Sequence, residues 1–280
     1  MNRIRHYLSD GEATLLEFLV HRVALKPEQA RRLLSFGAVY HNRERILSDR
    51  ALSPGEYIRV HVDPKRFPAD VVDWPASVIH ETDEFVVVNK PAGVPVHATV
   101  DNRLENVLYQ LSSALKTTLY ITQRLDTDVR GLLVLAKTRE FQRQFNRLLI
   151  ERKVKKTYRA LVASPPPLGR HVHYMTVSDR SPKTVSTINQ ENTVECVLSI
   201  VDVKAVDYFF DIEIDLETGR THQIRAQLSA MGCPVVGDVM YGSTLGYDPG
   251  IALFSAATSW CLEDSEPIQF ELAPPWISRT

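Results

Sequence analysis

A short polar segment ahead of an apolar run holds the residues best suited to chemistry. Arg124 and Asp126 stand directly before GLLVLA at 131–136, a run with the length and composition of a buried strand. A short carboxylate at the edge of a core can act as a nucleophile and form a covalent ester with a substrate. Taken alone, however, an Asp before a strand is usually a turn former that accepts local hydrogen bonds.

Two residues further along the chain suit the same kind of site. Tyr158 lies in KKTYRALV, and Arg225 lies in HQIRAQLSAMG, whose apolar residues recur at helical spacing. An Arg beside Asp126 would keep that carboxylate ionised, because an opposite charge that is not titrated away favours the charged form. Without neighbouring motifs, a core tyrosine and a surface helix arginine are the simpler interpretations.

Four segments, taken in order, connect these residues. They are NKPAGVPVH at 89–97, RLDTDVRGLLVLAKT at 124–138, KKTYRALV at 155–162 and ETGRTHQIRAQLSAMGCPVVGDVMYG at 217–242. Together they resemble the RluA-type pseudouridine synthases, and the similarity extends over residues 80–276. The resemblance implies an α+β pseudouridine synthase fold, with a mixed, largely antiparallel sheet flanked by helices. It also implies an isomerase that converts specific uridines in structured RNA to pseudouridine.

The resemblance assigns a role to each catalytic residue. Asp126 is the nucleophile that acts while the glycosidic bond moves from N1 to C5, with attack at the ribose C1′ and at the ring C6 both open. Tyr158 stacks on the flipped base and helps to remove the C5 proton, and Arg225 pairs with the Asp126 carboxylate. Arg124 helps to occupy the space that the extruded base leaves. An isomerisation needs no redox partner or group donor, so we expect no cofactor and no metal.

Further residues are expected to contact RNA around the cleft. Lys90 belongs to the first motif, which we expect to form a loop near the catalytic carboxylate. Arg220 lies in a turn that opens the helix carrying Arg225, where Thr221 is expected to cap the helix and His222 to be structural. Lys90 and Arg220 are therefore predicted to bind RNA.

The N-terminal part of the sequence has its own pattern. Residues 14–19 and 26–37 are typical of short helices, and the stretches around 38–42 and 56–62 are typical of strands separated by a polar turn. With its basic second helix, this order resembles the S4 RNA-binding module. The usual Asn-Gly turn of that module is replaced here by Asn42-Arg43.

This pattern predicts how the chain divides into domains. We expect a small S4-like α/β domain at 1–64 that binds RNA through Arg31 and Arg32, although surface helices often carry such residues without binding anything. The prolines of 65–77 disrupt helical and strand periodicity and predict a linker. The catalytic domain is expected at 78–280.

The overall charge gives no support for a nucleic-acid partner. The 33 Lys and Arg against 34 Asp and Glu give a formal net charge of −1, so RNA binding must depend on local clusters. One such basic track surrounds the two central motifs and is expected to hold phosphates, which predicts RNA binding that weakens as salt rises. Its members are Arg130, Lys137, Arg139, Arg143, Arg147, Arg152, Lys153, Lys155, Lys156 and Arg159.

Some positions depart from the family pattern and keep alternatives open. Gln123 stands where family members commonly have His, Val129-Arg130-Gly131 replaces a Ser/Thr-Ser-Gly, and Phe254-Ser255 interrupts the usual Leu-His-Ala. These departures concern target choice, and they leave a catalytically weak or inactive RNA-binding protein that acts on RNA folding as an alternative. A hydrolase in which Asp126 serves as base to His222 is disfavoured, because the sequence has no GxSxG motif.

Cysteine spacing and the N-terminal segment bear on compartment and partners. Cys196, Cys233 and Cys261 have neither CxxC nor His spacing for zinc, and we expect them to be buried in a reducing compartment. The start of the sequence lacks a signal-peptide pattern, and no apolar run is long enough to span a bilayer. We therefore expect a cytoplasmic monomer without membrane contact. Its predicted partner is RNA, with ribosomal RNA favoured and transfer RNA as the alternative.

Overall fold

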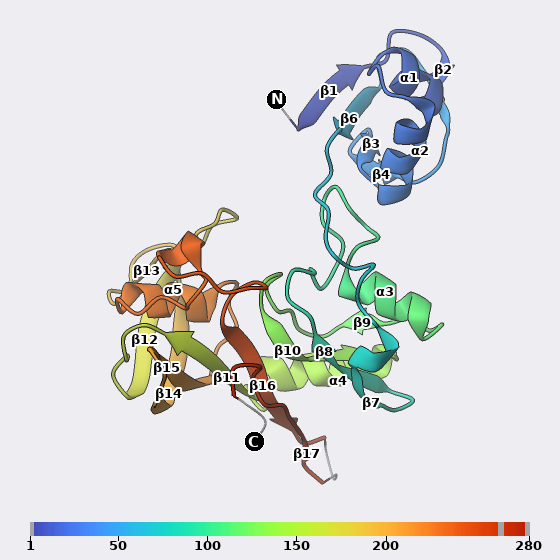
Figure 1. Ribbon diagram of the computed structural model, residues 1–280. Coiled ribbons are helices and arrows are strands. Elements are labelled where there is room, and N and C mark those ends of the chain that lie inside the picture. Colours follow the sequence, from blue (N-terminus) through green and yellow to red (C-terminus); the bar gives the residue numbers. More distant parts are fainter. Residues whose placement is uncertain (1–2, 263–265, 278–280) are drawn as a thin grey trace.

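The computed structural model of the chain describes residues 3–262 and 266–277, and Figure 1 shows two units joined by an extended segment. The outer ends of the two predicted domains, residues 1–2 and 278–280, lie outside the described residues. None of the helices in the described ranges has the length and apolar content needed to cross a bilayer.

The N-terminal unit packs two helices against a small antiparallel sheet. Helix α1 begins with a capping box, in which the side chain of Thr14 accepts from Glu17 N and the side chain of Glu17 accepts from Thr14 N. Helix α2 ends at Gly37, whose φ of +67° is left-handed. The elements are β1 (Ile4–Leu8), β2 (Ala13–Thr14), α1 (Leu15–His21), α2 (Pro27–Phe36), β3 (Val39–His41), β4 (Glu44–Ile46), β5 (Ala51–Leu52) and β6 (Tyr57–His61).

The two helices and two strands predicted for this unit are confirmed, whereas strands β1, β2, β4 and β5 were missed. Strand β1 pairs antiparallel with β6, more than forty residues along the chain. Its sequence IRHYL shows no apolar face because most of its side chains are exposed. The unit has its own apolar core, formed by α1, α2 and the strands, and residues such as Leu15, Leu19 and Ile58 are completely buried in it.

The larger unit is built on one mixed sheet. Its strand order is β13-β12-β14-β15-β11-β16-β10-β8-β7, with β17 beside β16 and β9 beside β10. Every pairing in it is antiparallel except that of β10 with β16. The strands are β7 (Val78–Glu81), β8 (Phe85–Lys90), β9 (Tyr120–Ile121), β10 (Arg130–Ala136), β11 (Lys155–Val162), β12 (Gly169–Thr176), β13 (Val185–Ser186), β14 (Thr193–Val206), β15 (Phe209–Leu216), β16 (Leu253–Trp260) and β17 (Ile268–Glu271). The predicted α+β fold with a largely antiparallel sheet is confirmed.

Helices cover parts of the sheet on both sides. Helix α4 packs Phe141 and Phe145 against Trp260 on one face, while the residues of β8 and β10 that point the other way belong to a second, larger core. This alternation explains why residues 85–88 of β8 and 132–136 of β10 form continuous apolar runs. The helices of this unit are η1 (Pro75–Ser77), α3 (Val107–Ala114), α4 (Arg139–Ile150), α5 (Gln223–Ala230) and η2 (Val239–Tyr241). Cys196 and Cys233 are buried as predicted, whereas the prediction for Cys261 is wrong, because it follows the end of β16 and is exposed.

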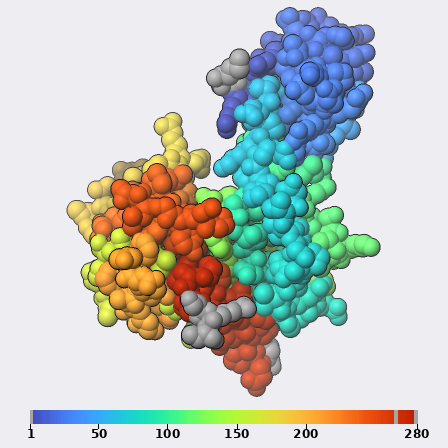
Figure 2. Space-filling model, viewed as in Figure 1, coloured from blue at the N-terminus to red at the C-terminus, as the bar shows by residue number. Residues whose placement is uncertain are grey.

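The segment at 65–77 connects the units and is packed rather than loose. Trp74 is buried in the large core, and its Nε1 donates to the carbonyl of Ala69 at 2.8 Å. The N-terminal unit also meets the loop before α3, where Tyr40 Oη donates to the carbonyl of Val100 at 2.7 Å and Arg45 Nη2 donates to that of Thr99 at 2.6 Å. Figure 2 shows the N-terminal unit, in blue, above the larger unit.

Candidate active site

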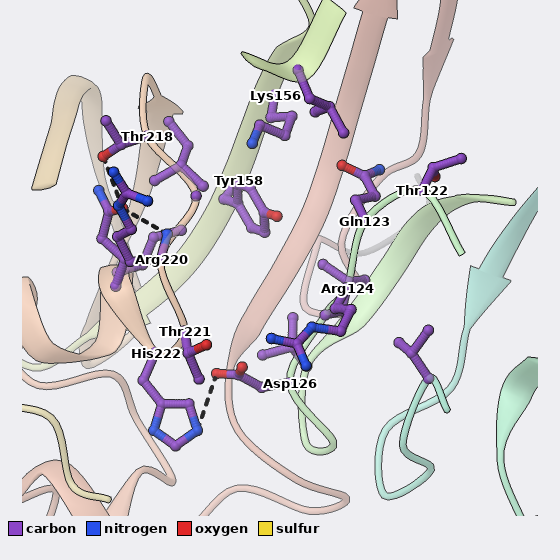
Figure 3. A pocket seen from close by; sticks show the side chains of 18 of the residues that line it. Thr122, Gln123, Arg124, Asp126, Lys156, Tyr158, Thr218, Arg220, Thr221 and His222 are labelled. Atoms are coloured by element: carbon purple, nitrogen blue, oxygen red, sulfur yellow. Dashed lines mark hydrogen bonds and ion pairs between the residues drawn. The ribbon is translucent and has the colours of Figure 1, made fainter. Parts of the chain in front are cut away.

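Segments from all four motifs meet at one cavity of about 780 Å³. Asp126 reaches it from the loop between β9 and β10, Tyr158 from β11, and Arg225 from the first turn of α5. Figure 3 shows Asp126, Tyr158 and Arg124 around this cavity, with Arg124 beside Asp126. The three residues predicted to be catalytic therefore lie together.

A close approach of two strands shapes the loop that carries Asp126. Gly131 has a φ of +107° and pairs with Ser255 in the parallel contact of β10 with β16. A Cβ on Gly131 would overlap the backbone of Ser255, so only glycine fits. The loop that carries Asp126 therefore joins β10 through a left-handed glycine five residues after Asp126.

Lys90 holds the same loop from inside. Its side chain is 0% exposed, and its Nζ donates to the carbonyls of Pro91, Thr127 and Val129 at 2.8, 2.9 and 2.8 Å. Burial lowers the pKa of Lys90 to about 7, whereas three carbonyl acceptors match the three donors of an ammonium group. The prediction that Lys90 contacts RNA is wrong, because the end of β8 turns this side chain beneath the Asp126 loop and away from solvent.

Arg225 bridges two carboxylates. Its Nη1 lies 3.1 Å from Asp126 Oδ2, while its Nε and Nη2 bond Asp238 at 2.6 and 2.9 Å. Arg225 and Asp238 are 4% and 1% exposed, and the ring of Tyr241 stacks 4.9 Å from the guanidinium carbon. Although burial acts against the charge, the bonds to Asp238 and Asp126 raise the pKa of Arg225 above its ordinary value. The guanidinium is thus fixed in place and presents one edge to Asp126.

Sequence reasoning missed Asp238. The signal was a lone acid inside the apolar stretch CPVVGDVMYG, where an exposed loop would carry more polar residues. A buried carboxylate needs a cationic partner, and an arginine is the partner that can bond both of its oxygens. The sequence alone did not show that this partner would be Arg225.

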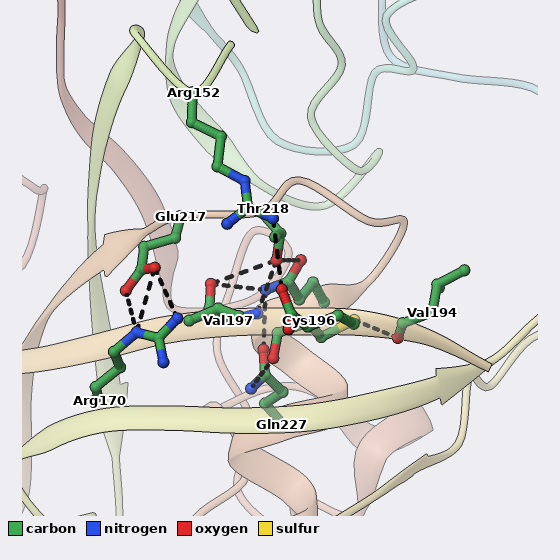
Figure 4. Close-up of polar contacts among 10 residues, drawn as sticks. Arg152, Arg170, Val194, Cys196, Val197, Glu217, Thr218 and Gln227 are labelled. Atoms are coloured by element: carbon green, nitrogen blue, oxygen red, sulfur yellow. Dashed lines mark hydrogen bonds and ion pairs between the residues drawn. The ribbon is translucent and has the colours of Figure 1, made fainter. Parts of the chain in front are cut away.

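The turn before α5 differs from the prediction. Thr221 does not cap the helix, because α5 begins at Gln223 and the residue before it, His222, is left-handed with a φ of +59°. Gln223 organises the turn instead, since its Oε1 accepts from Arg220 N at 3.0 Å and from Thr218 Oγ1 at 2.8 Å. Figure 4 shows the buried network around Thr218, which ties the turn to β14.

His222 faces the Asp126 carboxylate, although it was expected to be only structural. Its Nε2 lies 3.8 Å from Asp126 Oδ2, and its Nδ1 lies 3.0 Å from Tyr241 Oη. That phenol oxygen accepts from Lys183 N at 2.8 Å, which leaves its own hydrogen to donate to Nδ1. Burial lowers the pKa of His222, so the neutral ring then carries its proton on Nε2 and points it toward Asp126.

Tyr158 is 8% exposed and lies on β11 opposite Ser255 of β16. Burial, together with the nearby Asp126 charge, raises the pKa of Tyr158 far above its ordinary value despite a hydrogen bond with Ser255. The phenol therefore stays protonated. Ser255 is one of the positions that depart from the family pattern. Its hydrogen bond with Tyr158 places this departure next to the cavity.

The remaining predicted residues divide into two groups. Arg124 and Arg220 are exposed and line the cavity, and Arg124 Nη1 lies 3.3 Å from His97 Nε2. Arg31 and Arg32 are exposed on α2 of the N-terminal unit and are not part of the cavity wall. Among the described residues, no group of three or more His, Cys, Asp or Glu is placed to hold a metal ion.

Several side chains of the predicted basic track pair with acids of the protein and do not line the cavity. Arg159 pairs with Asp211 and Glu213, and Lys137 pairs with Glu81. Helix α4 directs Arg143 toward Glu140 of its own surface, because residues three apart are neighbours on a helix. The members of the track that line the cavity are Arg152 and Lys156.

Solved structures identify the class of protein that this fold and cavity define. The structure titled Human RNA Pseudouridylate Synthase Domain Containing 4 matches with a TM-score of 0.60 at 21% identity, over 72% of this chain and 90% of its own. Human RNA Pseudouridylate Synthase Domain Containing 1 matches with a TM-score of 0.57 at 24% identity, over 71% and 83%. The architecture is therefore the pseudouridine synthase fold.

The sequence comparisons lead to the family. Residues 84–230 match the family described as RNA pseudouridylate synthase. Ribosomal large subunit pseudouridine synthase D of Zymomonas mobilis is 31% identical, over 78% of this chain and 73% of that protein. The chain belongs to the RNA pseudouridylate synthase family, and the predicted RluA-type resemblance is confirmed.

Two plant proteins are also similar and are longer. RNA pseudouridine synthase 6, chloroplastic, of Oryza sativa is 31% identical over 85% of this chain, and its Arabidopsis thaliana counterpart is 36% identical over 67%. The chain spans 64% and 45% of their respective lengths.

Proposed function

We propose that this chain is an RNA pseudouridine synthase that isomerises specific uridines in structured RNA, with Asp126 as the nucleophile. The observation that carries the proposal is the Asp126 carboxylate, held 3.1 Å from the buried Arg225 guanidinium and sharing a cavity with Tyr158. The guanidinium bonds one carboxylate oxygen and orients the group without blocking its second oxygen. Family membership supports assigning this chemistry to the cavity.

The reaction that we propose balances within the nucleotide. Asp126 forms a covalent bond to the target nucleotide, the N1–C1′ bond breaks, and a C5–C1′ bond forms after the base has turned. The bond between Asp126 and the nucleotide breaks before the product leaves, which regenerates the carboxylate. The proton lost from C5 is matched by one gained at N1, so no cofactor or outside donor is needed. Because Tyr158 stays protonated, its place in the cavity supports a role in stacking on the base more than a role as a phenolate base.

The base must leave its stack to reach Asp126. Unstacking costs roughly a few kcal/mol, which contacts with the protein must offset. Arg124 lies exposed at the cavity wall beside Asp126, and we propose that it occupies the space that the base vacates. Arg220 lies exposed on the opposite wall and supports a contact with the RNA backbone.

RNA is the proposed partner, with ribosomal RNA favoured and transfer RNA as the alternative. The name of the Zymomonas mobilis relative refers to the large ribosomal subunit, which supports the first choice. The S4-like identity of residues 1–64, the monomeric state and the cytoplasmic location stay predictions. The two plant relatives carry the word chloroplastic in their names.

The test is a carbodiimide map of pseudouridine in cells that contain or lack the chain. Carbodiimide adducts stop reverse transcriptase at pseudouridine, so each modified site appears as a stop. We expect stops at defined uridines that occur only in cells with the chain. If the map is the same in both and the protein binds RNA, the alternative of an inactive RNA-binding protein replaces the proposal.

Neutralising the exposed face of α2 is expected to weaken RNA binding without affecting the catalytic cavity. In the double variant Arg31→Gln/Arg32→Gln, loss of up to two phosphate contacts should flatten the slope of log affinity against log salt by about 1 to 2 units. Filter binding over a range of salt concentrations measures this slope. The matched control is Arg143→Gln on α4, whose side chain pairs with Glu140. Equal slopes for both variants would reject the role given to the N-terminal unit.

Removing the phenol oxygen of Tyr241 is expected to slow the reaction. Tyr241→Phe keeps the ring over Arg225 but loses the donor that sets the His222 tautomer, and one such hydrogen bond corresponds to a fall in kcat of about five- to tenfold. Single-turnover rates and RNA affinity measure the two effects separately, and affinity should not change. The control is Tyr247→Phe, because the Tyr247 ring packs on Trp276 and is not part of the Tyr241–His222–Asp126 contacts. A wild-type rate for Tyr241→Phe would contradict a role of the Tyr241–His222 hydrogen bond in the reaction.

A further inference from the structure

A lysine at the far end of the cavity has no use in the proposed reaction. Lys156 precedes Tyr158 by two residues on β11, so both side chains lie on the same face of the strand, about 6.6 Å apart along it. Its Nζ lies 3.1 Å from the position that a Cβ on Gly219 would take. Figure 3 shows the Lys156 amine facing the wall that carries Thr218 and Arg220.

Lys156 is partly buried and lines the cavity without a protein partner among the described residues. Within the described residues it makes no side-chain hydrogen bond or ion pair, whereas Arg159 on the same strand pairs with Asp211 and Glu213. Its surroundings are partly desolvated, and this burial lowers the pKa of Lys156. A desolvated cation without a partner costs stability unless a ligand supplies the missing negative charge.

The surroundings of Lys156 are positive. Arg220 and Arg152 line the same end of the cavity. Arg220 makes no ion pair with any described residue, whereas Arg152 Nη2 lies 3.4 Å from Glu195 Oε1 and is partly neutralised. Glu217, an acid of the same wall, is bonded by Arg170 at 2.9 Å and so is partly neutralised. Figure 4 shows Glu217 turned toward Arg170, with Arg152 above Thr218.

We infer that Lys156, assisted by Arg220 and Arg152, forms a phosphate subsite that holds a backbone phosphate of the RNA beside the flipped target nucleotide. Several cations around one end of the cavity are more than the neutral edge of a uracil ring requires. A lysine ammonium binds phosphate as a compact point charge on a flexible stem. The inference rests on the proposed function, because the position of the target nucleotide is taken from Asp126 and Tyr158.

The strand offers a matched control for the test. Lys155 is exposed and lies next to Lys156, so its side chain points to the opposite face of β11. We compare Lys156→Met, Lys156→Arg and Lys155→Met with the wild-type chain, using a fluorescein-labelled oligouridylate as the probe. Thermal melting of each variant verifies that the fold is kept.

Lys156→Met is expected to bind the oligouridylate about tenfold more weakly and to flatten the salt slope by about one unit, as loss of one phosphate contact does. Lys156→Arg should keep most of the affinity, and Lys155→Met should match the wild type. Oligouridylates with a single neutral methylphosphonate linkage then locate the phosphate. One linkage should weaken binding to the wild type and leave binding to Lys156→Met unchanged.

Each contrary outcome identifies what fails. Equal affinity of Lys156→Met and Lys155→Met overturns the inference. Weaker binding by Lys156→Met without coupling to any linkage also overturns it, because the contact is then to a base. These results leave the carbodiimide map intact, whereas failure of the proposed function removes the chain-dependent stops themselves. A wild-type chain that does not bind the probe at low salt counts against the phosphate subsite, whereas the proposed function is tested by the map.

Discussion

Changing Asp126 to Asn is expected to abolish pseudouridine formation and to leave folding and RNA binding nearly unchanged. An amide cannot form the covalent bond that we propose, and loss of a nucleophile lowers turnover by at least about 10⁴-fold. The fold tolerates the change because Arg225 keeps both of its bonds to Asp238. One hydrogen bond is weakened, for a cost in unfolding free energy of about 1 kcal/mol.

The measurement is single-turnover modification of a uridine identified by the carbodiimide map, together with RNA affinity and thermal melting. Asp128→Asn is the control, because Asp128 follows Asp126 by two residues but does not line the cavity. We expect Asp128→Asn to modify RNA at a rate close to that of the wild type. Substantial turnover by Asp126→Asn would assign the nucleophile to another residue.

Replacing Arg225 with Met is expected to remove activity and to destabilise the fold. Asp238 would remain buried at 1% exposure without its counter-charge, and breaking a buried ion pair on one side costs about 3–5 kcal/mol of unfolding free energy. Asp126 would also lose the guanidinium that orients its carboxylate. Chemical denaturation followed by circular dichroism gives the stability, and single-turnover kinetics gives the activity.

A double variant separates the two effects. Arg225→Met/Asp238→Leu removes both buried charges, and apolar replacement of a whole buried pair is often neutral for stability. We expect the double variant to recover most of the lost unfolding free energy while activity stays absent, because Asp126 still has no guanidinium beside it. If activity returned together with stability, Arg225 would serve only the fold.

The sequence predicted the main outline of this protein for physical reasons that are local. Apolar runs of strand length, helical spacing and capping residues are properties of neighbouring positions, so the α+β class and most elements could be predicted. The ordered motifs indicated Asp126, Tyr158 and Arg225, which the structure brings into one cavity. Strand β1 was missed because its partner β6 lies far along the chain.

Only the tertiary structure decided which charges serve the site. Lys90 looked like a loop cation, yet the pairing of β8 with β10 places its ammonium beneath the Asp126 loop, where three carbonyls surround it. Asp238 and His222 belong to the site because they contact Arg225 and Asp126, which lie elsewhere in the sequence. Among the basic track, strand register decided that Arg159 would pair with acids while Lys156 would face the cavity. Residue type determines what chemistry a side chain can perform, but its partners depend on how distant segments pack, because burial and charge pairing are properties of the folded chain.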